Sequence, residues 1–323
     1  MSETIKLLEG QEITGVKVMN LKTFLHNYSC MVNDINIVLI DCKSDYAETN
    51  IKIRNRKDFC DFIDTYGNSM VNEWMVSNGC GVPWIRFYLQ NLVKEEKPTT
   101  RPTTKEELKK IIEETIEKEG NNCDLNFIDT SLITDMSHLF ANSFFNGDIS
   151  KWDVSKVKYM CCMFFNSKFN GDISKWNVSN VENMIEMFDS SEFNGNISNW
   201  NVSSVKSMRA MFSYSLFEQD ISKWDVSSVE NMGEMFYCSN FNGNIADWNV
   251  SKVTNMSFMF ADSNFNGDIS KWDVSSVTNI HSMFYNTYFN GDISKWNVSK
   301  VRDMSYAFSE CPLEENKPKW YKF

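Results

Sequence analysis

Tryptophan recurs at a fixed interval of 24 residues along the C-terminal part of this 323-residue chain. Around most of these tryptophans the chain repeats one phrase, which is FNGDISKWDVS at 145–155 and FNGDISKWNVS one interval later. Self-similarity at a period of this size is typical of stacked units that bury their apolar side chains against one another. The repeat therefore limits the fold to an array of such units. The tryptophans of the series are Trp152, Trp176, Trp200, Trp224, Trp248, Trp272, Trp296 and Trp320.

Each unit combines two kinds of apolar spacing. Trp152 and Val154 are two residues apart, so they share one face of a predicted short strand. Met160 and Phe164 are four apart, which predicts a helical or 3-10 segment with one face inward. An Asn-Gly pair then predicts the turn that leads into the next unit. The sequence thus predicts an α/β solenoid with parallel strands that spans 124–323 and has about eight units.

Three segments precede this array. Residues 1–93 do not repeat, and they predict a small α+β domain. Its expected strands are at 12–18, 35–42, 50–55, 70–76 and 84–89, and its expected helices are at 20–28 and 56–67. Residues 94–104 are charged and rich in threonine and proline, which indicates a linker. Residues 105–123 predict a helix that caps the open apolar end of the first unit, with Thr104 and Glu107 as a capping box and Gly120 as the stop.

Two polar positions per unit flank the tryptophan on the predicted strand and should point outward on a concave face. One hypothesis is that these side chains keep the array soluble, since aspartate and asparagine alternate and limit the stacking of like charges. The other is that they form a repeated polar strip that binds a partner. We call these residues the flanking strip: Lys151, Asp153, Lys175, Asn177, Asn199, Asn201, Lys223, Asp225, Asp247, Asn249, Lys271, Asp273, Lys295 and Asn297.

Composition argues against several classes of function. The formal net charge is −11 and no segment has a basic excess, so nucleic acid is not an expected partner. No signal peptide and no long apolar run is found, so we expect no membrane insertion and a cytoplasmic or virion-associated location, with the cell surface as the alternative. The nine cysteines form no C-x-x-C pair, and one aspartate per unit is too few for calcium. We therefore expect no metal and no cofactor.

Catalytic motifs are also missing from the sequence. The three histidines have unrelated positions, and no phosphate-binding or hydrolase motif occurs. Cys80, between two glycines, is the one place where a reactive thiol could lie, although a simple loop cysteine is the other interpretation. We therefore expect no catalytic residue and no enzymatic activity.

The unit, written W-D-V-S-S-V-T-N-M-S-x-M-F-x-x-S-x-F-N-G-D-I-S-x, resembles the repeat of BspA-type leucine-rich-repeat proteins. The resemblance covers about 124–320 and is highly specific, because a unit of this length matches over many consecutive copies. It implies a leucine-rich-repeat-like solenoid, which we expect to be right-handed, with no enzymatic role. Members described as surface proteins bind host or microbial partners.

Three hypotheses of function follow. The first is a non-enzymatic scaffold that binds a protein or a repetitive polar surface, with residues 1–93 as an attachment or homo-oligomerisation module. The second is a cell-surface or virion adhesin of the same architecture. The third, less favoured, is an enzyme within residues 1–93.

Overall fold

The computed structural model describes residues 12–20, 35–41, 47–53, 56–66, 70–79, 82–91 and 99–322. The chain divides into two compact units, Met1–Pro98 and Thr99–Phe323. The boundary falls inside the segment 94–104 that the sequence marks as a linker. Each unit is described by itself.

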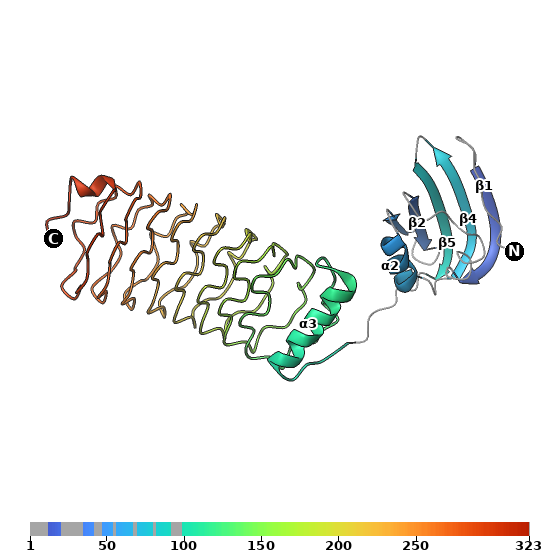
Figure 1. Ribbon diagram of the computed structural model, residues 1–323, viewed down its shortest axis with the longest axis horizontal. Helices are drawn as coiled ribbons and strands as arrows, with labels where there is room; N and C mark the ends of the chain where they lie inside the picture. The colour runs from blue at the N-terminus through green and yellow to red at the C-terminus, as the bar shows by residue number, and fades with distance from the viewer. Residues whose placement is uncertain are drawn as a thin grey trace. The chain divides into compact units, whose positions relative to one another are not determined.

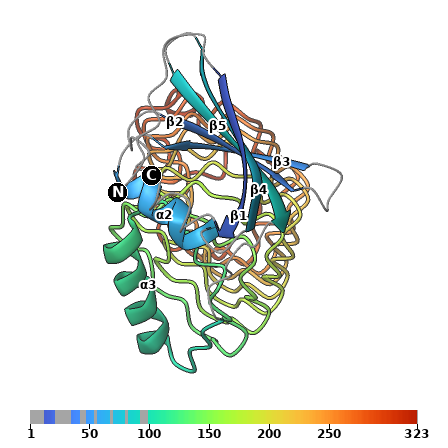
Figure 2. The same cartoon turned by 90° about the vertical axis from the view of Figure 1, so that its right-hand side faces the viewer.

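The first unit is built on one five-stranded sheet with the strand order β1-β4-β5-β2-β3 (Figures 1 and 2). Neighbouring strands are antiparallel, except that β2 and β5 run parallel. Helix α2 contacts β3, and Phe62 on the helix is buried, as is Ile53 on the strand. The predicted helix at 20–28 lies outside the described residues. The elements are β1 (Glu12–Asn20), β2 (Ile35–Asp41), β3 (Ala47–Ile53), α2 (Arg56–Tyr66), β4 (Met70–Gly79) and β5 (Val82–Asn91).

The second unit begins with helix α3 (Lys105–Glu119), which has a clear capping interaction at each end. At the start, Oγ1 of Thr104 accepts a hydrogen bond from the Glu107 amide at 3.2 Å. The Glu107 carboxylate accepts from the amide of Thr103 at 2.8 Å. The reciprocal bond of the capping box therefore involves the residue before the cap. At the end, Gly120 has a φ of 88°, a conformation that glycine adopts without steric cost.

Helix α3 packs against the first coil of the stack that follows (Figures 1 and 2). Leu108 and Ile112 are almost completely buried in the same apolar core as the coils. On the neighbouring rim, Lys105 forms an ion pair with Asp135 at 3.1 Å. The helix thus covers apolar side chains that no preceding coil would cover.

After α3 the chain forms a stack of coils, in which each buried side chain lies against its equivalent in the next coil (Figure 1). The rings of Trp152 and Trp176 are 6.5 Å apart and differ by 1° in plane. The rings of Phe164 and Phe188 are 5.6 Å apart, also with a difference of 1°. Burying one such side chain contributes about 1.5–3 kcal/mol, so these rows dominate the stability of the stack.

Most backbone links between coils lie in the segment that follows the tryptophan, at 158–166 and its equivalents. Tyr159 forms a parallel bridge with Asn183, and the same bridge recurs along the stack. The amides of Met160 and Cys162 donate to carbonyls of the next coil at 3.0 and 2.8 Å. Phe164 and Asn166 continue this ladder at 3.0 and 2.8 Å. We call this segment of each coil the ladder arm.

The expected strand at Trp152–Val154 is therefore wrong, and so is the expected helical or 3-10 segment around Met160 and Phe164. The structure has neither element there, and it links successive coils through the ladder arm instead. The reason lies in the backbone: in every coil two residues four apart, such as Cys162 and Asn166, have positive φ. A residue in this left-handed region costs about 1–2 kcal/mol, but it ends a right-handed turn and directs amides toward the next coil.

The tryptophan has a polar role in addition to its place in the core. Nε1 of Trp176 donates to the carbonyl of Ile149, 27 residues earlier, at 3.2 Å. The same bond recurs in every coil, from Trp152 to Trp320. It satisfies a buried indole N–H and ties the coils together at a point outside the ladder arm.

The asparagine of the Asn-Gly pair forms a second row of bonds between coils. The amide of Asn170 donates to Oδ1 of Asn146 at 2.8 Å, and that of Asn194 donates to Oδ1 of Asn170 at 2.9 Å. The row is interrupted where Glu218 replaces asparagine, since within 99–322 no bond joins the next asparagine, Asn242, to it. The departure from the repeated phrase at this point thus removes one tie between coils.

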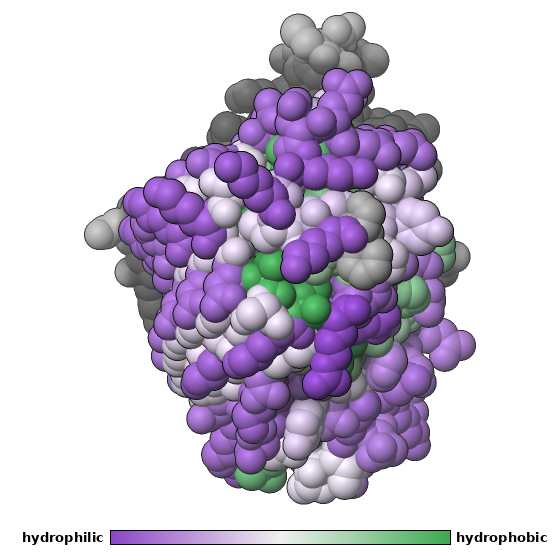
Figure 3. Space-filling view, turned by 90° about the vertical axis from the view of Figure 1, so that its left-hand side faces the viewer, coloured by the Kyte–Doolittle hydropathy of each residue, from purple (hydrophilic) through white to green (hydrophobic). Residues whose placement is uncertain are grey.

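The C-terminal end of the stack is less completely covered than its start. Val298 and Val301 are partly buried, whereas the equivalent valines in earlier coils are almost inaccessible. The short 3-10 helix η1 (Pro312–Glu314) and the ring of Trp320 lie over this end. A small apolar patch with a polar rim is visible there in Figure 3.

Candidate interaction surface

The structure places every residue of the flanking strip on the surface. Each pair brackets a buried tryptophan, so that Lys151 and Asp153 are exposed while Trp152 is 3% exposed. Because the pairs repeat in register, they form two polar rows along the stack. No parallel strand supports these rows, since the ladder arm lies elsewhere in the coil.

The second member of each pair uses its side chain to build a turn. Oδ1 of Asp153 accepts a hydrogen bond from the amide of Ser155 at 2.9 Å, and its equivalents do the same. Hydrogen bonds from the Ser155 hydroxyl and amide hold the pKa of Asp153 below its ordinary value. The aspartates of the FNGD phrase behave likewise, since Asp148 accepts from the amide of Ser150 at 2.9 Å. This local bonding explains why aspartate and asparagine interchange at these positions.

A second surface carries residues that differ strongly from coil to coil. It is formed by four positions of the ladder arm, those of Cys161, Cys162, Phe165 and Asn166, and by those of their equivalents that are exposed or half-buried. We call this surface the variable face. Over the whole stack it holds aromatic, acidic, basic and small side chains in an irregular order. The flanking strip, by contrast, repeats lysine, aspartate and asparagine almost unchanged.

Aromatic side chains form a continuous row on the C-terminal half of the variable face. The ring of Tyr214 contacts that of Tyr237 edge to face with 5.1 Å between centroids. Phe258 continues the row at 6.1 Å from Tyr237, and His281 follows at 4.9 Å from Phe258. Tyr306 ends it at 5.9 Å from His281. The two terminal tyrosines are 54% and 63% exposed, so a partner can reach the row.

A charged cluster lies beside the aromatic row, toward the N-terminus. Arg209 donates through Nη1 to Glu186 at 2.7 Å and through Nη2 to both carboxylate oxygens of Glu234 at 3.1 Å. The cluster therefore joins three successive coils. Its single cation is shared by two carboxylates, which leaves the cluster acidic.

Two further groups next to this cluster have raised pKa values. Burial, with a smaller contribution from neighbouring carboxylates, raises the pKa of Asp189 to about 6. Burial raises the pKa of Cys162 to about 12, and its thiol donates to Glu186 at 3.4 Å. A thiol with such a pKa is not a nucleophile at neutral pH.

The raised pKa of Asp189 leads to a prediction about pH. The folded protein holds this proton more tightly than the unfolded chain, whose carboxyl has a pKa of about 3.8. Stability should therefore rise as the pH falls from 7 to about 4.5. We expect the urea midpoint to increase over this range in the wild type and to increase less in Asp189→Asn. Equal shifts in the two proteins would contradict the prediction. The carboxylates with lowered pKa begin to lose stability below about pH 5 in both proteins, so the difference between the two proteins isolates Asp189.

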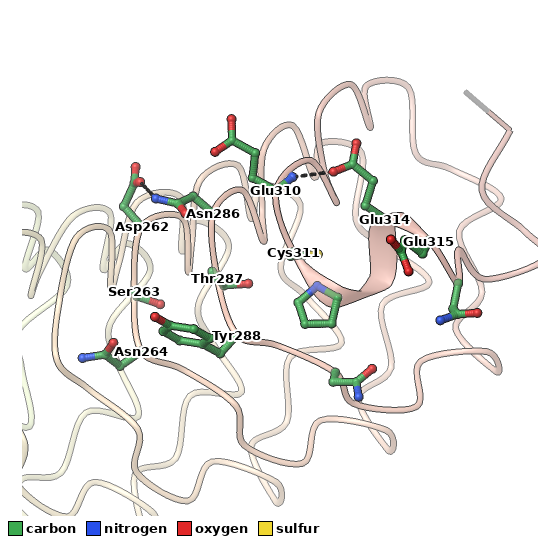
Figure 4. Close-up of a pocket in the computed structure, with 13 residues that line it drawn as sticks. Asp262, Ser263, Asn264, Asn286, Thr287, Tyr288, Glu310, Cys311, Glu314 and Glu315 are labelled. Atoms are coloured by element: carbon green, nitrogen blue, oxygen red, sulfur yellow. Dashed lines mark hydrogen bonds between the residues drawn. The ribbon is translucent and has the colours of Figure 1, made fainter.

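A hollow of about 810 Å³ opens at the C-terminal end of the variable face (Figure 4). Asp262 and Glu310 belong to the variable face and also line the hollow. Glu314 and Tyr288 line the hollow from other segments. Two of its acids are already bonded: Asp262 accepts from Asn286 at 2.8 Å, and Glu314 accepts from the amide of Glu310 at 2.7 Å. The ring of Tyr288 is 73% exposed. The hollow thus combines an accessible ring with carboxylates.

Other kinds of site have little support in the part of the chain that the structure describes. Within those residues, no group of three or more histidine, cysteine, aspartate or glutamate side chains could hold a metal ion. None of the described helices is long and apolar enough to cross a lipid bilayer. Cys80, the one candidate for a reactive thiol, lies outside the described residues.

The aromatic row and the charged cluster were not identified from the sequence as sites. Their members are 21 to 25 residues apart and occupy different positions of the unit, so no short motif contains them. The available signal was the variability of these positions within an otherwise uniform repeat. The structure shows that neighbouring irregularities come into contact.

The comparison with protein families agrees with the repeat. A family model described as "Mycoplasma protein of unknown function, DUF285" matches residues 107–216 and again residues 213–320. The matches cover most of α3 and nearly all of the stack. The chain belongs to the DUF285 family. In general terms this is the BspA-like repeat family, so the resemblance seen in the sequence holds at that level. No curated protein and no solved structure gives a significant match.

Proposed function

We propose that this DUF285 protein is a non-enzymatic interaction scaffold. In this proposal residues 124–323 are a leucine-rich-repeat-like, right-handed solenoid, and residues 1–93 attach the protein to another structure or dimerise. The partner is a protein, which binds along the stack.

One observation carries the proposal: the interior of the stack is uniform while one of its surfaces is not. Buried positions repeat the same side chain from coil to coil, as in the rows of Trp152 and Phe164. The variable face changes at nearly every coil, although it lies on the same backbone ladder. Such a platform can present a specific pattern of side chains without changing its core. No observation on residues 99–322 supports a catalytic function to the same degree.

Photo-crosslinking with the full chain tests this function. A benzoylphenylalanine is introduced at one coil after another, in one series on the variable face and in a second series on the flanking strip. In cells of the source organism we expect crosslinks to a distinct protein from one surface and not from the other. The second surface serves as the matched control for expression and folding. If no position on either surface crosslinks to a protein, the scaffold proposal is wrong.

A further inference from the structure

We propose that the variable face, from Tyr214 to the C-terminal hollow, binds an extended cationic segment of the partner protein, rich in arginine or lysine. This proposal rests on the proposed scaffold function and names the chemistry of the partner. It concerns a surface different from the flanking strip.

The charge of the variable face favours a cationic partner. From Tyr214 onward its four positions carry three carboxylates and no lysine or arginine, and the one guanidinium of the face, that of Arg209, lies just before this segment. That guanidinium is already bonded by Glu186 and Glu234, so it is not available to attract an acidic partner. Beyond it, the remaining carboxylates of the face have no lysine or arginine ion partner among the described residues. These carboxylates are Asp262 and Glu310.

The aromatic row supplies the second element of recognition. A guanidinium or ammonium group is attracted to the face of an aromatic ring within about 6 Å of its centroid. Edge-to-face packing between consecutive members of the row, from Tyr214 to Tyr306, turns successive rings in different directions. The rings and the carboxylates of Glu234, Asp262 and Glu310 lie at the same four positions of successive coils, and together they suit arginine and lysine better than an apolar side chain.

The length of the row fits an extended peptide. Tyr214 and Tyr306 are separated by four coil steps, or about 20 Å at about 4.8 Å per step. An extended chain covers this distance in about six residues at about 3.3 Å each. At the end of the row, Asp262 and Glu310 lead into the hollow, where Tyr288 and Glu314 could flank one more cationic side chain (Figure 4).

Fluorescence anisotropy with the full chain and three labelled peptides tests this inference. The peptides are twelve-residue alternations of glycine with arginine, with glutamate, or with glutamine. We expect saturable binding of the arginine peptide alone at 150 mM salt, and weaker binding at 500 mM salt. Absence of saturable binding, or equal binding of the glutamine peptide, would overturn the inference.

Paired variants identify the surface. Asp262→Asn with Glu310→Gln removes two charges from the variable face, and Asp153→Asn with Asp225→Asn removes two from the flanking strip. Equivalent coils already use asparagine at the positions of Asp262, Asp153 and Asp225, so the folds should be preserved. We expect the first pair to raise the Kd at least tenfold and the second pair to change it less than twofold. Equal effects would show only diffuse attraction to an acidic protein and would overturn the proposal.

A third variant tests the rings without changing the charge. Tyr214→Leu with Tyr306→Leu should raise the Kd at least fivefold, and an unchanged Kd would exclude a contribution from these rings. The crosslinking experiment separates the two proposals. A partner crosslinked to the flanking strip would overturn the cationic-segment inference and leave the scaffold function standing.

Discussion

Replacing Met232 by aspartate should destabilise residues 99–323 by about 5 kcal/mol or more. Met232 is fully buried in the middle of the stack, and its amide donates to the carbonyl of Asn255 in the next coil at 3.0 Å. A carboxylate there has no cation to pair with, because the core around it is built from methionine, phenylalanine and valine rows. The charge would also lie between two coils, so it would weaken the contact between the coils that precede it and the coils that follow it.

Urea unfolding followed by tryptophan fluorescence measures this effect, since tryptophans recur along the whole stack. The matched control is Leu216→Asp, which makes the same change in charge at a side chain that is 55% exposed. We expect the control to change the free energy of unfolding by less than about 0.5 kcal/mol. If the two variants have similar midpoints, the interior of the stack is not the packed core described above.

Removing residues 177–200, one complete unit, should leave a shorter stack that still folds and unfolds cooperatively. The deletion joins Trp176 to Asn201, so every later residue keeps its position within the unit. Each buried row then loses one member, and the equivalent side chains on either side of the deletion pack on each other. For example, Phe164 packs on Phe212 in place of Phe188. At about 0.05–0.15 kcal/mol per residue, the loss should be about 1–4 kcal/mol. Removing a whole unit should therefore cost less than changing one buried methionine to aspartate.

Circular dichroism and urea titration of the deletion variant, compared with the intact chain, measure this outcome. A single cooperative transition at a lower midpoint is expected from units that contact only their neighbours. Loss of cooperative unfolding would argue against the solenoid that we propose. It would indicate instead that residues far apart in the stack depend on one another.

The core and the capping helix could be predicted from the sequence because their signals are local or strictly periodic. The fixed interval between tryptophans places Trp152 against Trp176 in any stack of equal units, and the structure has them in parallel planes. For the helix at Lys105–Glu119, the apolar stripe and the residues that cap both ends all lie within one short segment. In such cases the spacing of residues along the chain determines the outcome.

The path of the backbone within each coil could not be predicted in the same way. Trp152 and Val154 have the spacing of a strand, yet the bridge between coils forms at Tyr159. Cys162 adopts a positive φ although it is not glycine, because the bond from its amide to the next coil offsets the local cost. Propensity describes an isolated segment, and here the neighbouring coil overrides it. The binding role of the flanking strip stays a prediction.

The sequence by itself determined the period, the identity of the buried rows and the position of the cap, because these depend on spacing along the chain. The tertiary structure decided which arm carries the ladder and which irregular residues meet on one surface. Arg209 contacts Glu186 and Glu234 only because stacking brings residues 23 and 25 positions away to its side. A fixed period repeats every position alike, so only the contacts between coils can turn scattered exceptions into one acidic and aromatic surface.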